Sequence, residues 1–329
     1  MVGGERSSMK SLDVGVPQGS VLGPFLFSVY VSPIASVISS FGVHFHQYAD
    51  DTQLYTAVRA GSDSVSIRRL EECSLAVRDW FLENGMLLNP DKSEVLLAGT
   101  RAQTQKLQGA GLAVAGSDIK FSVKLKSLGV TVDQSLSLDD HVTSVVKASN
   151  FHIRALRHIR PTLNREVANT VACSIVTTRI GYCNSLLHGT SAKNIDKLQR
   201  VQNALARVVT GSTRRSHIKP VLKELHWLPV AQRVQYKVAV ITHKVLSTRQ
   251  PLYLADIIKE HRPARQLRSS TQNLLAVRKT NTRLAERAFS FSSAAVWNSL
   301  PDKLRSADVD HRSFKKKLKT HLFSVAYCL

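Results

Sequence analysis

The spacing of apolar residues changes along the chain, from a mixture of strand-like and helix-like patterns to an almost purely helical one. Several short segments alternate apolar and polar positions, which predicts half-buried strands. Among them, apolar positions from Ile67 to Phe81 recur at helical spacing, and Gly85 is placed to end that helix. The strand-like segments lie at residues 43–48, 52–58, 86–88, 95–98, 119–123 and 128–132. The first part of the chain therefore mixes helix with antiparallel strand.

From about Asp139 onward the pattern predicts helices alone. One of them starts near Ser191 and stops at Gly211, with an apolar stripe from Ile195 to Val208. Other helices are predicted at residues 139–160 and 165–187, after Pro229, around Phe289–Trp297 and around Phe314–Leu318, with a polar connector over 261–281. The predicted fold class is α+β with an all-helical second part.

Basic residues are concentrated in the helical part. Residues 1–140 hold 12 Lys and Arg against 15 Asp and Glu, whereas residues 141–329 hold 33 against 9. A helical segment this basic indicates a polyanionic partner, either nucleic acid or an anionic membrane surface. The membrane alternative is weaker, because lipid binding needs exposed apolar helix faces and these faces are needed for a core. A basic surface that is merely solvated is the remaining alternative.

Cysteine spacing and hydropathy argue against several other classes of protein. The four cysteines stand at positions 73, 173, 183 and 328 without CxxC spacing, so neither a zinc site nor a disulfide framework is predicted. Buried, reduced thiols are expected. The sequence shows no signal-peptide pattern and no run of about 18 apolar residues. We therefore expect an intracellular protein, nuclear or cytoplasmic and not secreted, with no membrane segment.

Two adjacent acids, Asp50 and Asp51, stand where a tight hairpin between the first two predicted strands would turn. Acids are common in turns, so the pair alone indicates little. A hairpin would nevertheless hold two carboxylates at the tip of a rigid sheet, and Mg²⁺ prefers such hard oxygen ligands. Nucleotidyl transfer uses two Mg²⁺ ions about 3.5–4 Å apart. Because side chains alternate along a strand, His44, His46, Tyr48 and Asp50 are predicted to share one face.

Four segments, in this order and spacing, resemble boxes of reverse transcriptases from LINE-type (non-LTR) retrotransposons. The segment from Gly15 to Pro24, GVPQGSVLGP, resembles the box that contacts template and nucleotide. Tyr48-Ala49-Asp50-Asp51 resembles the metal-binding box, and Leu88–Glu94 resembles the box that follows it. Leu128-Gly129-Val130 is similar to the primer-grip region.

The resemblance implies an incomplete reverse-transcriptase palm, an antiparallel sheet with helices, over residues 1–137. A helical, thumb-like domain would follow over residues 138–260, and a basic connector with C-terminal helices over residues 261–329. Arg179–Asn184 and Leu225–Pro229 are similar to segments behind the palm in these elements. The implied activity is RNA-directed DNA polymerisation with Mg²⁺ (or Mn²⁺), an RNA template, a DNA primer and dNTP. The oligomeric state is left open.

The resemblance also implies roles for residues of the predicted palm. Asp50 and Asp51 would be metal ligands, with Asp51 the less essential of the two, and Tyr48 would contact substrate. Lys92 would assist departing pyrophosphate as an acid or as a positive charge. The alternative for Lys92 is a loop lysine that stays in water.

Other implied contacts to substrate come from turns. Pro17, Gln18 and Gly19 would lie against template and incoming nucleotide, with the glycine allowing close backbone approach, and Gly129 would lie near the primer. The alternative for Gln18 is a turn residue bonded to backbone. The basic residues expected to neutralise phosphates without contacting bases are Lys147, Arg154, Arg157, Lys193, Lys197, Arg200, Arg207, Arg214 and Arg215.

Reverse transcriptases carry a further metal-binding aspartate on a strand well upstream of the Pro-Gln-Gly box. Only 14 residues precede that box here, and the surroundings of Asp13 do not resemble that strand. We therefore expect an N-terminally truncated polymerase with no useful activity by itself, because losing one member of a catalytic unit costs about 10⁴–10⁶ in rate. The alternative function is a basic nucleic-acid-binding protein without catalysis.

Overall fold

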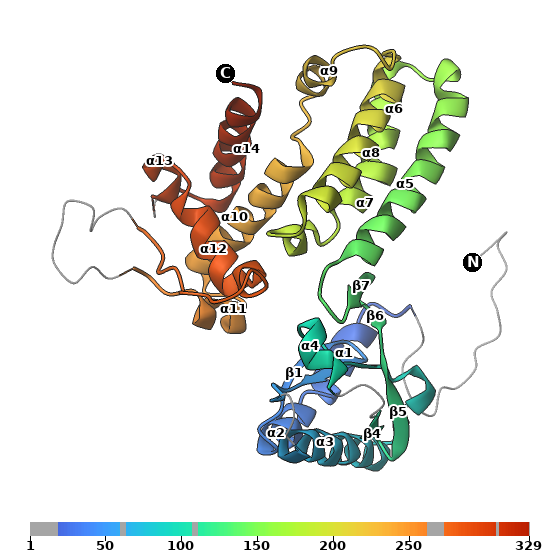
Figure 1. Ribbon diagram of the computed structural model, residues 1–329, viewed down its shortest axis with the longest axis vertical. Coiled ribbons are helices and arrows are strands. Elements are labelled where there is room, and N and C mark those ends of the chain that lie inside the picture. Colours follow the sequence, from blue (N-terminus) through green and yellow to red (C-terminus); the bar gives the residue numbers. More distant parts are fainter. Residues whose placement is uncertain (1–18, 60–63, 107–110, 262–272, 307–308, 329) are drawn as a thin grey trace. The chain divides into compact units, whose positions relative to one another are not determined.

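The computed structural model describes residues 19–59, 64–106, 111–261, 273–306 and 309–328 (Figure 1). By its internal contacts the chain divides into two compact units, an N-terminal unit (Met1–Leu125) and a C-terminal unit (Lys126–Leu329). Helices and small sheets occur together, so the predicted mixed class is confirmed. The finer division into palm, thumb and connector at residues 137 and 260 stays a prediction.

The N-terminal unit is built around a small apolar core. Helices α2 and α3 pack together, and Ile34, Ile38, Cys73 and Val77 are its almost fully buried residues along with Val43. Cys73 and Val77 are four residues apart and so share one helix face, as the sequence pattern predicted. The described elements of this unit are α1 (Gly23–Tyr30), α2 (Ile34–Ser40), β1 (His44–Tyr48), β2 (Asp51–Tyr55), α3 (Ser64–Glu83), β3 (Val95–Leu96), α4 (Arg101–Gln105), β4 (Gly111–Val114) and β5 (Ser117–Ser122).

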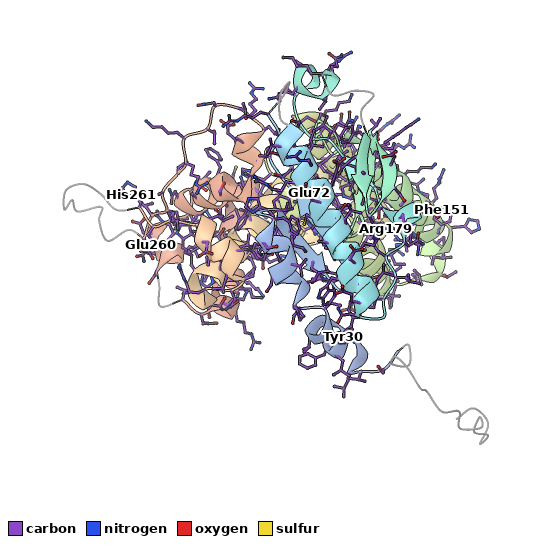
Figure 2. All side chains as sticks on the ribbon, turned by 90° about the horizontal axis from the view of Figure 1, so that it is seen from below. Tyr30, Glu72, Phe151, Arg179, Glu260 and His261 are labelled. Atoms are coloured by element: carbon purple, nitrogen blue, oxygen red, sulfur yellow. The ribbon has the colours of Figure 1, made fainter. Side chains whose placement is uncertain are left out.

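Helix α1 exposes most of its apolar side chains within the described residues, and none of its residues is buried. Its Tyr30 hydroxyl donates to the Asn84 carbonyl at 3.0 Å, near the end of α3 (Figure 2). By length and composition alone, the stretch Gly23–Ser40 is apolar enough to cross a membrane, with a mean hydropathy of 1.3. The expectation that no such stretch exists is therefore corrected. The chain turns between α1 and α2, so each helix is only about 10–12 Å long.

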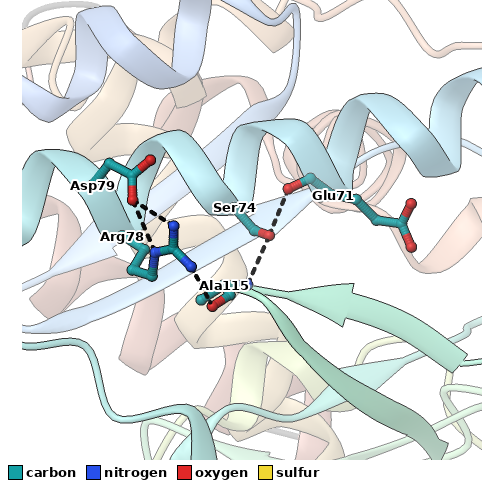
Figure 3. Close-up of polar contacts among 5 residues, drawn as sticks. All are labelled: Glu71, Ser74, Arg78, Asp79 and Ala115. Carbon is teal, nitrogen blue, oxygen red and sulfur yellow. Dashed lines mark hydrogen bonds and ion pairs between the residues drawn. The ribbon is translucent and has the colours of Figure 1, made fainter.

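Helix α3 is bonded to the turn of the β4–β5 hairpin by two polar side chains (Figure 3). The Ser74 hydroxyl accepts from the Ala115 N–H at 3.0 Å, and Nη1 of Arg78 donates to the Ala115 carbonyl at 3.1 Å. Nε and Nη2 of Arg78 also donate to Asp79. Ala115 and Gly116 have φ values of 53° and 88°, as a type I′ turn requires. Side chains of helix α3 thus hold the turn by bonding to the main chain of Ala115.

The sheets are shorter than the sequence pattern suggested. Strand β5 pairs antiparallel with β4 and parallel with β3, and β1 pairs antiparallel with β2. The predicted strand at 86–88 is wrong, because the chain there follows the helix end at Gly85 without pairing to a strand. The predicted strand at 95–98 keeps only its first two residues. Strand β4 and helix α4 were not predicted, since neither has an apolar period long enough to detect.

The C-terminal unit starts within the first strand of a hairpin, β6, and continues as helices (Figure 1). Helices α5, α6 and α8 enclose one core, in which Leu198, Leu205 and Val209 of α8 are almost fully buried. The elements are β6 (Lys124–Ser127), β7 (Val130–Asp133), α5 (Asp139–Ile159), α6 (Arg165–Ala172), α7 (Thr178–Gly181), α8 (Ala192–Thr210), α9 (Ile218–Glu224), α10 (Val230–Thr248), α11 (Leu252–Ile257), α12 (Phe289–Asn298), α13 (Asp302–Arg305) and α14 (His311–Tyr327).

The helix predicted over residues 165–187 is interrupted. A π-helical turn, Cys173–Thr177, separates α6 from α7, and a 3₁₀ turn follows over Asn184–Leu187. The hydroxyls of Thr170, Ser174 and Thr178 each donate to the carbonyl four residues earlier, a contact that bends helices. Cys183 then has a φ of 47°, which ends the helical path.

Asp133 organises the loop between β7 and α5. Its Oδ1 accepts from the Ser135 N–H and hydroxyl and from the Ser137 N–H, and its Oδ2 accepts from the Leu138 N–H at 2.8 Å. Burial opposes ionisation of this carboxyl, but the hydrogen bonds outweigh it, so the pKa of Asp133 is lowered. Leu136 and Leu138 both have positive φ, 53° and 63°. Asp133 therefore holds both strained residues, Leu138 through its carboxylate and Leu136 through its main-chain carbonyl.

A second core lies among α10, α12 and α14. Trp297 and Phe314 are buried there, and the ring of His243 stacks on Phe314 with centroids 4.1 Å apart. The Tyr327 hydroxyl at the end of α14 donates to the Trp227 carbonyl at 2.6 Å, which ties this core to the first. Burial raises the pKa of Tyr327 to about 12, against the opposing charge of Arg233.

The described cysteines are unpaired thiols, as expected. Cys73 is buried, and burial raises its pKa. Cys173 and Cys183 are half-buried, whereas Cys328 is exposed, so the expectation of burial is wrong at that position. Cys328 follows the last turn of α14 with a φ of 51°, beyond the packed face of the helix.

Candidate functional site

The predicted hairpin that carries Asp50 and Asp51 at its tip is present in the structure. Strands β1 and β2 pair antiparallel with Tyr48 opposite Asp51, which leaves Ala49 and Asp50 as a two-residue turn. Asp51 is thus the first residue of β2, one position earlier than predicted. Ala49 has a φ of 53°, an uncommon backbone for a residue with a Cβ. Asp50 and Asp51 are both exposed at this tip.

The two faces of the hairpin differ in chemistry. Phe45 and Leu54 are opposite each other and pack against the core of the N-terminal unit. The residues opposite each other on the exposed face are Tyr48 with Asp51, His46 with Gln53 and His44 with Tyr55. The predicted common face is confirmed for His44, His46 and Tyr48 by their shared exposure, but it is wrong for Asp50, which lies in the turn beyond the end of β1. Because opposite residues of a strand pair point to one side, the Asp51 carboxylate lies on that face too.

Tyr55 connects the two histidines of this face. Its ring stacks against His44 and His46, with centroid distances of 5.4 and 5.3 Å and interplanar angles of 24°. Its hydroxyl and His46 Nε2 are 3.3 Å apart. The three rings are therefore stacked on the exposed face of the hairpin, and Tyr48, two residues beyond His46 on the same face, is 69% exposed beside the acids. Sequence reasoning missed Tyr55, since a tyrosine in a half-buried strand is commonplace.

The chemistry of the two acids fits Mg²⁺ or Mn²⁺, because adjacent exposed carboxylates are hard oxygen ligands. Asp50 and Asp51 are the residues that would hold such an ion. Within the part of the chain that the structure describes, no group of three or more His, Cys, Asp or Glu side chains is placed to bind a metal. The described residues therefore supply two carboxylates of a site and no third side chain.

The other predicted residues of the N-terminal unit are placed as follows. Lys92 is exposed at the end of the 3₁₀ turn Pro90–Lys92, and among the described residues it forms no ion pair with Asp50 or Asp51. Gly19 is exposed with a φ of 90°, and a Cβ there would meet no atom within 4 Å. The glycine is thus required by backbone conformation. Pro17 and Gln18 lie outside the described residues.

Gly129 lies in the turn of the β6–β7 hairpin. Leu128 and Gly129 have φ values of 45° and 81°, which again fits a type I′ turn. The Tyr182 hydroxyl donates to the Leu128 carbonyl at 2.6 Å, and its ring lies 3.4 Å from the position of a Cβ on Gly129. Two segments that the resemblance matched separately, 128–130 and 179–184, are therefore in contact.

Helices α5 and α8 form a parallel pair that carries most of the predicted basic residues. At their N-terminal ends, Nδ2 of Asn194 donates to the Asp139 carboxylate at 2.7 Å. At their C-terminal ends, Nη2 of Arg160 donates to the Val209 carbonyl at 2.9 Å. On α5, Lys147, Arg154 and Arg157 share one helix face with groove residues Thr143 and Asn150, because their spacings of three and four place them there.

The first groove between these helices has a volume of about 420 Å³. Lys197 and Arg200 of α8 face Thr143 and Asn150 of α5 across it. Nζ of Lys197 donates to the Thr143 hydroxyl at 3.3 Å, so the cation lies against the seam between the helices. Two of the predicted basic residues are thus brought together with polar groups of the other helix.

A second groove, of about 790 Å³, lies farther along the same pair and contains arginines from three segments. Arg157 of α5, Arg207 of α8 and Arg214 after α8 line it, as does Arg160. No acidic residue is in its lining, and within the described residues none of these arginines has an acidic partner. The groove therefore concentrates positive charge without internal neutralisation.

Arg160 was missed by sequence reasoning. Its Nε donates to the carbonyls of Val208 and Val209, and its Nη1 donates to the Leu163 carbonyl at 2.7 Å. A cation at these free carbonyls stabilises the C-terminal end of α8. Arg160 therefore fixes the wall of the second groove and adds its own charge to it.

Several predicted basic residues lie outside the two groove linings. Lys147, Arg154 and Lys193 are exposed on helix surfaces instead, and Arg215 is exposed in the turn between α8 and α9. Phe151, between Lys147 and Arg154 in sequence, extends outward from α5 with 63% of its side chain exposed (Figure 2). Sequence reasoning missed this exposed aromatic residue, although its position off the apolar stripe of α5 was a usable signal.

The comparison with known families agrees with the hairpin geometry. Residues 2–132 match the family described as reverse transcriptase (RNA-dependent DNA polymerase), a range that includes the hairpin of Asp50 and Asp51. This part of the chain is therefore of the reverse-transcriptase class. No solved structure matches the chain.

Similar proteins indicate which kind of reverse transcriptase this chain resembles. The RNA-directed DNA polymerase from mobile element jockey of Drosophila melanogaster is 25% identical over 244 residues, which cover 71% of this chain and 26% of that protein. The Pol polyprotein from type-1 retrotransposable element R1 of Nasonia vitripennis is 23% identical over 228 residues, 65% of each chain. The chain is thus related to LINE-type (non-LTR) retrotransposon reverse transcriptases. It spans about a quarter of the length of the jockey polymerase that it matches.

Proposed function

We propose that this chain is part of an RNA-directed DNA polymerase that acts by two-metal nucleotidyl transfer. The observation that carries the proposal is the β1–β2 hairpin, which presents Asp50 and Asp51 at an exposed tip beside Tyr48. When bound there, Mg²⁺ supplies activation of a 3′-hydroxyl and stabilisation of pyrophosphate. The protein residues hold the carboxylates at a fixed turn, and Tyr48 offers an aromatic surface to the adjoining sugar or base.

The C-terminal unit supports the proposal with a surface for template and primer. Lys197 and Arg200 in the first groove, and Arg157, Arg207 and Arg214 in the second, provide cations along the parallel helices. Such a series suits the phosphates of an RNA–DNA hybrid and requires no base contact. If about six phosphates are contacted, the logarithm of the association constant falls with the logarithm of salt concentration at a slope of about −5.

Little polymerase activity is expected from this chain by itself. The described residues bring two carboxylates, and no third metal-binding side chain, to the hairpin. Catalytic groups that act together are strongly non-additive, so an incomplete set lowers the rate by a factor of about 10⁴ or more. Primer extension on an RNA template by the purified chain, abolished by Asp50→Ala, would contradict this expectation.

The metal site can be tested without polymerase activity. Fe²⁺ with ascorbate replaces Mg²⁺ and cleaves the polypeptide near the bound ion. The expected cleavage lies at the β1–β2 turn, is competed by Mg²⁺ and is lost in the double variant Asp50→Ala/Asp51→Ala. Asp118→Ala removes an exposed acid from β5 and serves as the matched control. Cleavage elsewhere, or cleavage unchanged by the double variant, would refute the assignment of the metal ligands.

A further inference from the structure

The β6–β7 hairpin is attached to the C-terminal unit at its tip. Tyr182, which follows α7, donates its hydroxyl to the Leu128 carbonyl at 2.6 Å. Its ring also packs beside Gly129, where a Cβ would lie 3.4 Å from Cε1. The contact thus combines a hydrogen bond with a fit that requires glycine, at a turn whose two residues both have left-handed backbone.

The base of the same hairpin is attached by other elements of the unit. Val130 of β7 is buried in the first core, and the Thr131 N–H donates to His141 Nδ1 on α5 at 3.4 Å. Beyond Asp133, a guanidinium N–H of Arg287 donates to the Leu136 carbonyl. A two-stranded hairpin has little stability alone, so these attachments determine where its tip lies.

Strand β6 carries two exposed lysines. Lys124 and Lys126 are two residues apart, so they stand on one side of the strand, and the intervening Leu125 is half-buried. Leu128 at the tip is 42% exposed. The hairpin therefore offers a cationic edge and an exposed turn, which is the chemistry that binds the sugar–phosphate backbone of a nucleic-acid strand.

We propose that Tyr182 is a positioning residue, which fixes the Leu128–Gly129 turn so that strand β6 binds the phosphate backbone of an RNA–DNA hybrid. This inference rests on the proposed function. Tyr182 acts through the turn and touches no reacting atom. Loss of its hydroxyl leaves the lysines present but lets the turn move, so the contact of Lys126 with phosphate weakens while the grooves of α5 and α8 keep theirs.

The positioning claim is tested first on the free protein by hydrogen exchange with mass spectrometry. Tyr182→Phe removes the hydroxyl and keeps the ring. We expect exchange in the peptide spanning residues 124–133 to be about fivefold faster, the usual effect of one lost hydrogen bond. Tyr327→Phe is the matched control, because Tyr327 also donates to a carbonyl at 2.6 Å in the same unit. Unchanged exchange of residues 124–133 in Tyr182→Phe would overturn the claim.

The contact with nucleic acid is tested by acetylating lysines with and without an RNA–DNA hybrid. In the unaltered chain and in Tyr327→Phe we expect the hybrid to protect Lys126 and Lys197. In Tyr182→Phe we expect the protection of Lys126 from acetylation to fall about fivefold, while Lys197 stays protected. If Tyr182→Phe disturbs the whole unit, Gly129→Ala perturbs the same contact from the turn side and should give the same selective loss.

Each pattern of protection at Lys126 and Lys197 decides a different part of the proposal. Protection of Lys197 without protection of Lys126 in the unaltered chain refutes the hairpin contact and leaves the proposed function standing. Equal protection of Lys126 in the unaltered chain, Tyr182→Phe and Gly129→Ala refutes the positioning role alone. Absence of protection at both lysines refutes nucleic-acid binding by this unit, and with it the inference.

Discussion

The Nδ1 atoms of His243 and His311 lie 3.2 Å apart in the second core, and Nε2 of His243 donates to the Val309 carbonyl at 2.9 Å. A carbonyl only accepts, so the Nε2 of His243 carries a proton, and the neutral ring accepts at Nδ1 from His311. Protonation of both rings would place two N–H groups against each other. The pair therefore tolerates at most one added proton without moving.

Acid should destabilise the C-terminal unit through this pair. Burial lowers the pKa of His243, and burial together with Lys315 and Lys244 lowers that of His311. The unfolded chain, with a histidine pKa near 6.5, then binds protons more readily than the folded one. The stability from this pair is complete above about pH 6.5 and falls as pH decreases below that value.

The measurement is urea denaturation at pH 7.5 and pH 5.5. His243→Gln should be less stable than the unaltered chain at pH 7.5 and should show a smaller loss on acidification. His158→Gln changes an exposed histidine of α5 and should keep the full loss. A pH dependence that is identical in His243→Gln and the unaltered chain would rule out the pair as its source.

The second groove should determine part of the salt dependence of nucleic-acid binding. The double variant Arg157→Ala/Arg207→Ala removes two cations from its lining. We expect weaker binding to an RNA–DNA hybrid and a salt slope smaller in magnitude by about 2, measured by fluorescence anisotropy. Arg312→Ala, at the exposed start of α14, should leave the slope unchanged. Equal slopes for all three proteins would exclude the groove from the binding surface.

Replacement of Asp133 should destabilise the C-terminal unit. Asp133→Ala leaves the N–H groups of Ser135, Ser137 and Leu138 without their charged acceptor. We expect a loss of about 2–3 kcal/mol in the free energy of unfolding, since hydrogen bonds to charged groups are the stronger kind. Asp196→Ala, an exposed acid of α8, is the control and should change it by less than about 0.5 kcal/mol. A loss no greater than that of the control would show that the loop is held by other contacts.

The turn of the β1–β2 hairpin should respond to the residue at position 49. Ala49 has left-handed backbone, which costs an L-residue about 1–2 kcal/mol. Ala49→Gly should therefore raise the stability of the N-terminal unit by about 0.5–1 kcal/mol, and Ala49→Val should lower it. Thermal unfolding of the two variants measures both effects. Destabilisation by glycine would mean that the turn carries no such strain.

Periodicity predicted the long elements well, because their burial is regular. Helices α5, α8, α10, α12 and α14 follow apolar stripes that the sequence shows directly. The interruption at Cys173–Thr177 was not predictable in this way, since a π-helical turn shifts the register of an otherwise apolar helix by one residue. Strand β3 has two residues and helix α4 has five, little more than one helical turn, so neither carries enough positions to show its period.

The sequence predicted which residues belong to the candidate site, but it predicted their arrangement in space only in part. The alternation from His44 to Tyr48 was enough to place Asp50 and Asp51 at a hairpin tip. The contacts that join distant segments gave no such pattern, because they end on main-chain carbonyls. Tyr182 bonded to Leu128 is one of these, and Arg160 bonded to Val209 is another.

The bonds from Tyr182 and Arg287 to the carbonyls of Leu128 and Leu136 have a consequence for sequence drift in related elements. Every amino acid has a carbonyl, so the outer side chains of this hairpin and loop can be exchanged while the anchors keep their acceptors. We expect substitutions to accumulate there at positions whose backbone angles the new residue can adopt. Replacement of either anchor has no such freedom, because few side chains reach as far with a donor.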